Sequence, residues 1–519
     1  MSRRIRLLLL VLCVALVPAS SAVADSFLVT NTKDSGTGSL RAAIAAANAH
    51  TGADIISIEV NGTIELQSAL QVIFDPVSIF GYDSDLQEIR RAAGAGGFSI
   101  FAFSTDAGPS SLTGVTVSNG RGAFGGGIRN AEGSLELSGV RVKGNEAVAE
   151  GGSDDHAEGG GVYSEGPLTM YGSIVSGNVA RASDGTTETV AAGGGVAAFD
   201  ALTVGTSTIS GNRVEATGGG GIASAQGGGL LTPAQTEIEL TTISGNSVSA
   251  EDGGTQTRAA GGGVTAFAAK LTSVTATGNS ATSSGTAVGA NLDAFMTTVV
   301  RNSIVSRPLG DAESCNGETT SGGYNLDEDG SCKFELGSDL NGVQAGLDRV
   351  LRDNDGATPT HALLPGSLAI DRGYSFGNFI DQRGWARPSD FPAISNKEGG
   401  DGSDIGAFEL QVPPDAVPLP PPPILVGSEP ADTTPPQTRI FSGPARVGYE
   451  RKAKFRFVSS EAQSIFLCKL DDKPWKKCRS PYKLTVKPGK HLFKVRAIDR
   501  FGNADPTPAR FGWRVKPVG

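Results

Sequence analysis

Long hydrophobic runs are missing from this 519-residue sequence beyond its first two dozen residues. We therefore expect no later segment with the roughly 20 apolar residues that a membrane-spanning helix needs. Histidine is scarce, with four residues in the whole chain. No Ser-His-Asp set, zinc-ligand spacing or phosphate-binding loop can be recognised. Long helical runs are also lacking, which excludes repeats built from paired helices.

The one apolar run lies at the N-terminus. Three arginines precede the apolar residues 7–17, and Ala22 and Ala24 supply the small residues of a cleavage site. This order is typical of a secretory signal peptide, and the run is too short to cross a bilayer. We predict a signal peptide over residues 1–24 and a secreted or cell-surface location. An uncleaved anchor is the alternative.

Cysteine is sparse, with five residues, one of them inside the predicted signal peptide. The remaining four are an even number, which suits two disulfides in an exported chain. Each lies close in sequence to one partner within its own part of the chain. We predict the bonds Cys315–Cys332 and Cys468–Cys478.

Charge is divided unevenly along the chain. The segment 433–519 holds 20 Lys and Arg against 6 Asp and Glu, whereas residues 25–432 hold 21 against 48. Between these parts, residues 412–436 are so rich in proline that they favour an extended spacer over helix or strand. We predict an acidic domain over 25–411, a linker over 412–436 and a basic domain over 437–519.

Glycine is abundant, with 72 residues, and much of it recurs at a fixed period. A glycine triplet followed by an aliphatic residue returns every 34 residues, and an asparagine follows each triplet after 16 to 18 residues. A period this regular between about 119 and 290 predicts a solenoid. The third glycines and the asparagines, which we expect to be structural, are Gly127, Gly161, Gly195, Gly229, Gly263, Asn145, Asn178, Asn212, Asn246 and Asn279.

The segments between triplet and asparagine are short, alternating and rich in β-branched residues, as in "LTVGTSTISGN". This pattern predicts strands, and a solenoid of strands is a parallel β-helix. Glycine suits sharp turns with positive φ and close approach of neighbouring coils. Asparagine tolerates left-handed turns, and its amide can bond the same amide one coil away.

Four consecutive repeats carry an insertion of eight or nine residues between the asparagine and the next triplet. The four segments together hold ten acidic and three basic residues. We expect loops on one edge of the rod, either a solvated, variable edge or a functional one.

The opening segment "FLVTNTKDSGTGSLRAAIAAANAH" resembles the N-terminal cap of secreted bacterial right-handed β-helix proteins of the pectate-lyase-like superfamily. Downstream, "TPTHALLPGSLAIDRG", "DQRGWARP" and "DIGAFE" resemble the C-terminal end of the same group, the choice-of-anchor Q type. The resemblance spans about 25 to 411 and implies right-handed winding. The residues of "SLRAAIAAANAH" independently favour a helix that covers the N-terminal end, with Ser39 as its N-cap and Leu40, Ile44 and Ala47 on one face.

The basic domain resembles the Ig-like domains of secreted bacterial proteins through "DTTPPQTRI" and "PGKHLFKVRAIDRFGNADPTPA". Alternating strands such as "KAKFRFV", separated by Gly, Pro and Asp turns, agree with a β-sandwich. The expected fold class is all-β, a right-handed parallel β-helix with a helical N-terminal cap followed by an Ig-like β-sandwich.

The sequence gives only weak signals for catalytic residues. Asp154, Asp155, His156 and Glu158 form the densest charged cluster, which we interpret as solvated. "DEDG" at 327–330 lacks the alternating aspartates of a calcium loop. We assign no catalytic, cofactor or metal residue and expect no cofactor.

We expect a monomeric, exported surface or extracellular protein, and we favour a binding function over an enzymatic one. The basic domain fits adhesion to an anionic polysaccharide or cell-wall polymer. One alternative is that the basic residues only make the surface soluble. Another is that the basic domain pairs with the acidic rod. The alternative function is a glycan-active β-helix enzyme, a lyase or hydrolase. We expect no nucleic-acid partner.

Overall fold

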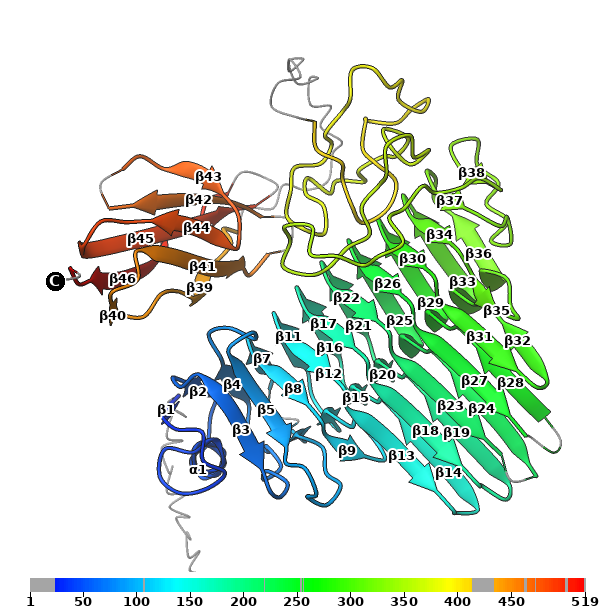
Figure 1. The fold of residues 1–519 in the computed structure, drawn as a ribbon, viewed down its shortest axis with the longest axis horizontal. Helices are drawn as coiled ribbons and strands as arrows, with labels where there is room; N and C mark the ends of the chain where they lie inside the picture. Colours follow the sequence, from blue (N-terminus) through cyan, green and yellow to red (C-terminus); the bar gives the residue numbers. More distant parts are fainter. Residues whose placement is uncertain are drawn as a thin grey trace, which may run out of the picture.

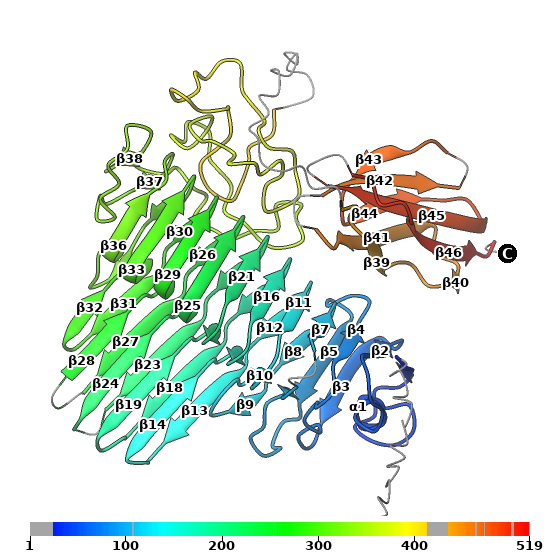
Figure 2. The ribbon, with the colours of Figure 1, turned by 180° about the vertical axis from the view of Figure 1, so that it is seen from behind.

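The computed structural model describes residues 24–105, 108–218, 220–252, 254, 256–412, 434–461, 464–471, 473–499 and 503–517. The predicted signal peptide and most of the predicted proline-rich linker lie outside these residues. Figure 1 shows a rod of stacked coils with a separate β domain beside its N-terminal end, and Figure 2 shows the same arrangement from behind. The all-β fold class, a parallel β-helix followed by a β-sandwich, is confirmed.

The helix α1 (Leu40–Ala47) covers the N-terminal end of the rod. Ser39 is its N-cap, and the Ser39 hydroxyl accepts a hydrogen bond from the Ala42 amide at 3.2 Å. The side chains of Leu40, Ile44 and Ala47 are buried on one face. The predicted helical cap is therefore present, with its N-cap and buried face at the expected residues.

One repeat illustrates how a coil is built. It begins with β15 (Val162–Ser164) and continues through β16 (Leu168–Tyr171) and β17 (Ile174–Ser176). Each strand pairs in parallel with its counterparts in the coils before and after, with no slip in register. The aliphatic residue after each glycine triplet points into the rod, where Val162 stacks between Ile128 and Val196.

The first sheet of the rod has 15 strands. They are β1 (Ser26–Val29), β2 (Asp54–Ile58), β4 (Val77–Phe80), β6 (Phe101–Phe103), β7 (Ser110–Thr113), β10 (Ile128–Asn130), β11 (Leu135–Ser138), β15, β16, β20 (Val196–Ala198), β21 (Leu202–Gly205), β25 (Leu230–Glu239), β29 (Val264–Thr272), β33 (Leu292–Arg301) and β36 (Cys315–Ser321).

The second sheet has 11 strands. They are β3 (Gly62–Leu66), β5 (Gln87–Arg91), β8 (Thr116–Ser118), β12 (Arg141–Lys143), β17, β22 (Thr208–Ser210), β26 (Thr242–Ser244), β30 (Thr275–Thr277), β34 (Ile304–Ser306), β37 (Leu326–Asp327) and β38 (Leu340–Asn341).

The insertions are not the solvated loops that the sequence led us to expect. Each goes out as one strand and returns as another, so the insertions of successive coils stack into two further parallel sheets, which we call the fin. The sheet of outgoing strands also takes in strands of the coils before and after the four insertions, and it consists of β9 (Arg121–Gly122), β13 (Glu146–Glu150), β18 (Val179–Ser183), β23 (Arg213–Thr217), β27 (Ser247–Glu251), β31 (Ser280–Ser283) and β35 (Leu309–Gly310). The returning strands are β14 (Asp154–Glu158), β19 (Glu188–Ala192), β24 (Ile222–Gln226), β28 (Gln256–Ala260) and β32 (Thr286–Val288).

Small side chains hold the fin together. Its buried core consists of alanines and two valines that alternate with outward-facing residues, most of them polar, as in a half-buried strand. The outgoing strands also carry a line of ion pairs on their outer surface, in which Arg181 bridges Glu146 and Glu215. Because these buried side chains are small, the two sheets of the fin can lie close together.

Residues 342–412, which we call the crown, contain no strand beyond isolated bridges and fold back onto the outer face of the second sheet. Polar side chains of that sheet bond the crown directly. Thr208 donates to the Pro359 carbonyl at 2.6 Å, Thr242 to the Gln382 side chain at 2.6 Å, and Ser244 pairs with His361 at 2.7 Å. The crown is therefore a cover for the rod and not a continuation of its coils.

The C-terminal β domain, which we call the module, has two sheets with a shared aromatic core. The three-stranded sheet contains β39 (Thr438–Ser442), β41 (Lys452–Ser459) and β44 (Tyr482–Thr485). The five-stranded sheet contains β40 (Val447–Gly448), β42 (Ile465–Leu470), β43 (Lys476–Cys478), β45 (Gly489–Ile498) and β46 (Ala509–Val515). Phe455 of one sheet stacks on Phe493 of the other at 4.0 Å between ring centroids.

Candidate functional site

The candidate site is the outer face of the five-stranded sheet in the module. Alternation along β45 buries Phe493, Val495 and Ala497 in the core, so the residues between them point outward. The same alternation operates on β42, β43 and β46. Together these strands present seven basic residues, which we call the cationic face: Lys469, Lys477, Lys490, Lys494, Arg496, Arg510 and Arg514.

Register places like charges directly opposite one another on this face. Lys494 pairs with Lys469 on one side and with Arg510 on the other, and Lys490 pairs with Arg514. Adjacent strands lie about 4.8 Å apart, and like charges directly opposite are unfavourable. The row Lys469–Lys494–Arg510 therefore costs folding stability, so packing alone does not account for it.

Acidic neighbours do not neutralise this face within the described part of the chain. No ion pair among the described residues involves any of the seven, and the module's own ion pair joins His491 to Asp471. The indole of Trp475 lies 4.9 Å from the Arg496 guanidinium and gives that cation a flat aromatic neighbour. The geometry provides a concentrated positive field that an anionic ligand would neutralise.

The three-stranded sheet has a second basic surface, on the side that points away from the core of the sandwich. This surface lies toward the rod, and we therefore call it the inner face. It consists of Arg439, Lys452, Lys454, Arg456 and Lys483. A hollow of about 270 Å³ between β41 and β44 is lined in part by its three lysines. Partial burial lowers the pKa of Lys454, and the nearby guanidinium of Arg456 lowers it further.

Two disulfides lie at the expected cysteines. Cys468 and Cys478 join β42 to β43 beside the cationic face, with 5.7 Å between their Cα atoms. Cys315 and Cys332 join residues near the end of the rod, with a Cα separation of 4.9 Å. Both predicted pairings are confirmed.

The asparagines form a ladder along the rod. The Asn178 side chain donates to the Asn212 carbonyl oxygen at 2.9 Å, and the same bond repeats from Asn145 to Asn178, Asn212 to Asn246 and Asn246 to Asn279. Every donor points the same way. Asn279 then bonds Asn291, and Asn291 bonds the Ser314 hydroxyl.

The third glycine of each triplet has no space for a side chain, because a Cβ on Gly161 would lie 2.6 Å from the Gly195 carbonyl oxygen. Positive φ belongs to other glycines, such as the first of each triplet (Gly159, φ 67°) and the one before each ladder asparagine (Gly177, φ 63°). The third glycines and ladder asparagines thus provide close packing and hydrogen bonds, while their neighbours make the turns.

The cluster around His156 does not converge. Strand alternation in β14 sends Asp155 inward, where it caps the Gly152 amide at 3.0 Å, and sends Asp154, His156 and Glu158 to the opposite side. His156 lies 4.0 Å from Glu158 and 3.9 Å from Glu188 of the next coil. Among the described residues, no three His, Cys, Asp or Glu side chains are placed to hold a metal.

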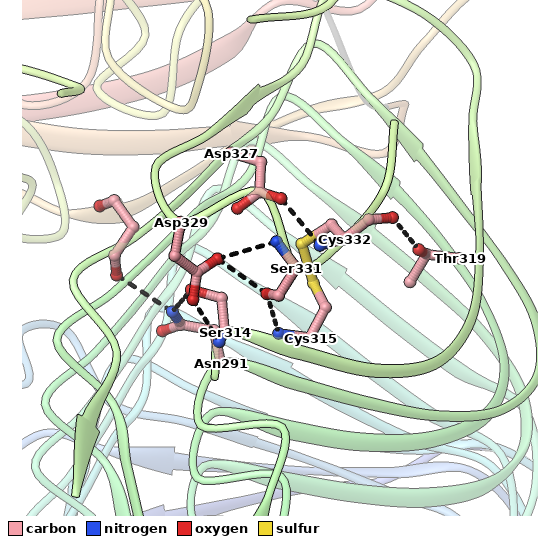
Figure 3. Close-up of a disulfide and its surroundings, with 9 residues drawn as sticks. Asn291, Ser314, Cys315, Thr319, Asp327, Asp329, Ser331 and Cys332 are labelled. Carbon is pink, nitrogen blue, oxygen red and sulfur yellow. Dashed lines mark hydrogen bonds between the residues drawn. A yellow bond between two sulfur atoms is a disulfide. The ribbon is translucent and has the colours of Figure 1, made fainter. Parts of the chain in front are cut away.

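The "DEDG" segment is structural. Figure 3 shows Asp327 and Asp329 beside the Cys315–Cys332 disulfide. Asp327 accepts from the Cys332 amide and Asp329 from the Ser314 amide, both at 2.8 Å. Burial raises the pKa of Asp327 to about 7, and the Asp329 carboxyl adds to the effect. The Ser314 hydroxyl accepts the last ladder bond, and the Ser314 backbone amide donates to Asp329, so the ladder ends beside a carboxylate.

The crown brings the motifs "DQRGWARP" and "DIGAFE" together and buries charged side chains of both. Arg387 forms an ion pair with Glu409 at 2.7 Å, and both side chains are fully buried. The Asp404 amide donates to Glu409, and the Asp371 amide donates to Asp404. Burial raises the pKa of Asp404 and Glu409 above the usual range. The motifs alone do not predict this buried network, because residues 22 positions apart meet only when the crown folds.

Two further surface features lie on the rod and crown. Three large apolar side chains, Phe267, Phe295 and Met296, are exposed where bulges interrupt β29 and β33. A cavity of about 390 Å³ lies among crown and rod-end residues and includes one carboxylate, that of Glu398. A glycosidase site needs at least two carboxyl groups around the scissile bond, which this cavity does not supply.

No helix among the described residues has the length and hydropathy needed to cross a bilayer. Comparison of the chain with protein-family models, with curated proteins and with solved structures finds no match.

Proposed function

We propose that the chain is an exported, non-enzymatic surface or extracellular protein whose module binds an anionic polysaccharide or cell-wall polymer. The cationic face is the binding surface, and the rod is the rigid body that carries it. The protein acts as a monomer and uses no cofactor.

The observation that carries this proposal is the row Lys469–Lys494–Arg510 across three neighbouring strands. Three cations at strand spacing match a polymer with closely spaced anionic groups better than one small anion. A solubilising surface would intersperse acidic residues among the basic ones. The outward positions of β42, β43, β45 and β46 contain none.

Export is supported by the N-terminal sequence and by the two disulfides, which persist in oxidising compartments. Membership of the pectate-lyase-like superfamily, with a choice-of-anchor Q type end, remains part of the proposal. It rests on the quoted motifs, together with the helical cap and the parallel β-helix that they imply.

A polysaccharide array tests this function with the full chain, scored for both binding and cleavage. We expect retention on a polyuronate and on a polymer of phosphodiesters, none on neutral dextran, and release as salt rises, since exposed charges are screened over about 8 Å at physiological ionic strength. Binding that persists unchanged in molar salt, or that is absent at low salt, would rule out electrostatic adhesion.

A glycan-active enzyme is the second candidate. The exposed Phe267, Phe295 and Met296 favour it, because apolar patches on the surface of a protein often mark ligand contacts. The same array separates the two functions, since shortened glycan chains would establish the enzyme.

A further inference from the structure

The inner face of the module meets the rod through arginines. Arg456 forms ion pairs with Asp83 at 3.6 Å and Asp85 at 3.1 Å, on the turn between β4 and β5. The Arg439 guanidinium lies over the Phe80 ring at 3.4 Å. All these rod residues lie in the N-terminal coils, beside which the module lies in both views (Figures 1 and 2).

A second contact reaches the crown. The Arg479 guanidinium of the module lies 3.1 Å from the centroid of the Trp385 ring. Guanidinium groups stack well on aromatic faces and are more weakly hydrated than lysine ammonium groups, so they suit interfaces. The module therefore contacts two separate parts of the rod body, which fixes its orientation better than one contact would.

The central ion pair is largely removed from water. The Arg456 side chain is 15% exposed and that of Asp83 is 14% exposed, so their attraction is screened less than that of a surface pair. The two carboxylates on the rod side also have partners within the rod. Asp83 accepts from the Asp85 amide at 2.9 Å, and Asp85 also pairs with Arg141 at 2.5 Å.

Apolar packing contributes little to this contact. Each hydrophobic core cluster of the described residues lies entirely in the rod and crown or entirely in the module. The contacts that join the module to the rod and crown are ion pairs and cation–π contacts. An interface of this kind weakens with salt, whereas one based on apolar burial does not.

We propose that the inner face is a docking surface for the rod, forming an ionic latch in which Asp83 and Asp85 hold Arg456. In a sandwich the outer faces of the two sheets point in opposite directions. Docking through the three-stranded sheet therefore directs the cationic face away from the acidic rod. The latch explains how one chain carries both charges without the rod occupying the module's binding face, and it does not depend on what that face binds.

Spin-label distance measurements on the full chain test the latch without any polymer present. Labels on non-canonical residues at Ser134 of the rod and Lys473 of the module, both exposed, report the relative placement of the two bodies. The variant Arg456→Glu removes the latch cation. Arg514→Glu is the matched control, because it makes the same charge change on the cationic face.

At about 50 mM salt, where the screening length is about 14 Å, we expect one narrow distance distribution in the wild type and in Arg514→Glu. Arg456→Glu, and the wild type in 1 M salt, should give a broad distribution. A narrow distribution in Arg456→Glu, a wild type that stays narrow in 1 M salt, or a wild type already broad at low salt would each overturn the latch. A result that overturns the latch would not affect the proposal that the cationic face binds a polymer, since no polymer is present in this experiment.

Discussion

The Asn212 side chain forms four hydrogen bonds inside the rod. Its oxygen accepts from the amide and the side chain of Asn178, and its nitrogen donates to the Asn246 oxygen and the Val175 carbonyl. The 34-residue period predicted such a stack from sequence, because a buried polar side chain can repeat at one position of every coil only if it both donates and accepts hydrogen bonds. The end of the ladder at Asp329 was not predictable, since the repeat has decayed there.

Asn212→Leu should lower the free energy of unfolding by roughly 3 kcal/mol or more, because it leaves at least two buried polar groups without partners at about 1–3 kcal/mol each. Urea unfolding followed by circular dichroism measures the change. Asn61→Leu, at an exposed position, is the control. Equal, small effects of both substitutions would mean that the ladder does not stabilise the rod.

The raised pKa of Asp327 predicts that the free energy of unfolding depends on pH. Its pKa is raised by burial to about 7, so the folded state retains a proton that the unfolded state has lost above about pH 4. Stability linked to this group is therefore full below pH 4 and is lost as pH rises toward 7. Asp327→Asn should flatten the change in unfolding free energy between pH 5 and pH 8, measured by urea titration. An unchanged slope would show that Asp327 is ionised in the folded protein at neutral pH.

The fin shows where sequence patterns fail at the scale of elements. Its strands alternate correctly, yet their inward residues are mostly alanine, which gives a weak hydrophobic signal. Neighbouring glycines and charges then make the segments resemble loops. The coil strands were predictable because their inward residues are valine, leucine and isoleucine. Small side chains suffice in the fin because its two sheets approach closely.

Ala216→Leu should destabilise the fin by about 1–3 kcal/mol, because added methylene groups have no space between the sheets. Ala216 is buried in β23, whereas the adjacent Thr217 is exposed, so Thr217→Leu serves as the control. Hydrogen exchange of the fin amides reports the local loss of stability. Equal exchange in the two variants would contradict a closely packed alanine core.

At the scale of the whole molecule, charge asymmetry was visible in the sequence but its placement was not. A count of basic residues cannot say that they divide between two opposite faces of a sandwich, because that depends on strand register. The two basic faces have different surroundings. Arg456 on one meets carboxylates of the rod, and Lys494 on the other is flanked by Lys469 and Arg510.

The most direct test of this division is the affinity of the full chain for an immobilised polyuronate. Lys494→Glu/Arg510→Glu changes the cationic face, and Lys473→Glu/Lys487→Glu makes the same charge change on exposed turns of the module. We expect the first pair to weaken binding about tenfold or more, since each charge contact contributes up to about 1 kcal/mol and both cations are reversed. The turn variant should bind nearly as well as the wild type. Equal losses in both variants would show that only net charge matters, and full affinity in Lys494→Glu/Arg510→Glu would contradict the assignment of the cationic face.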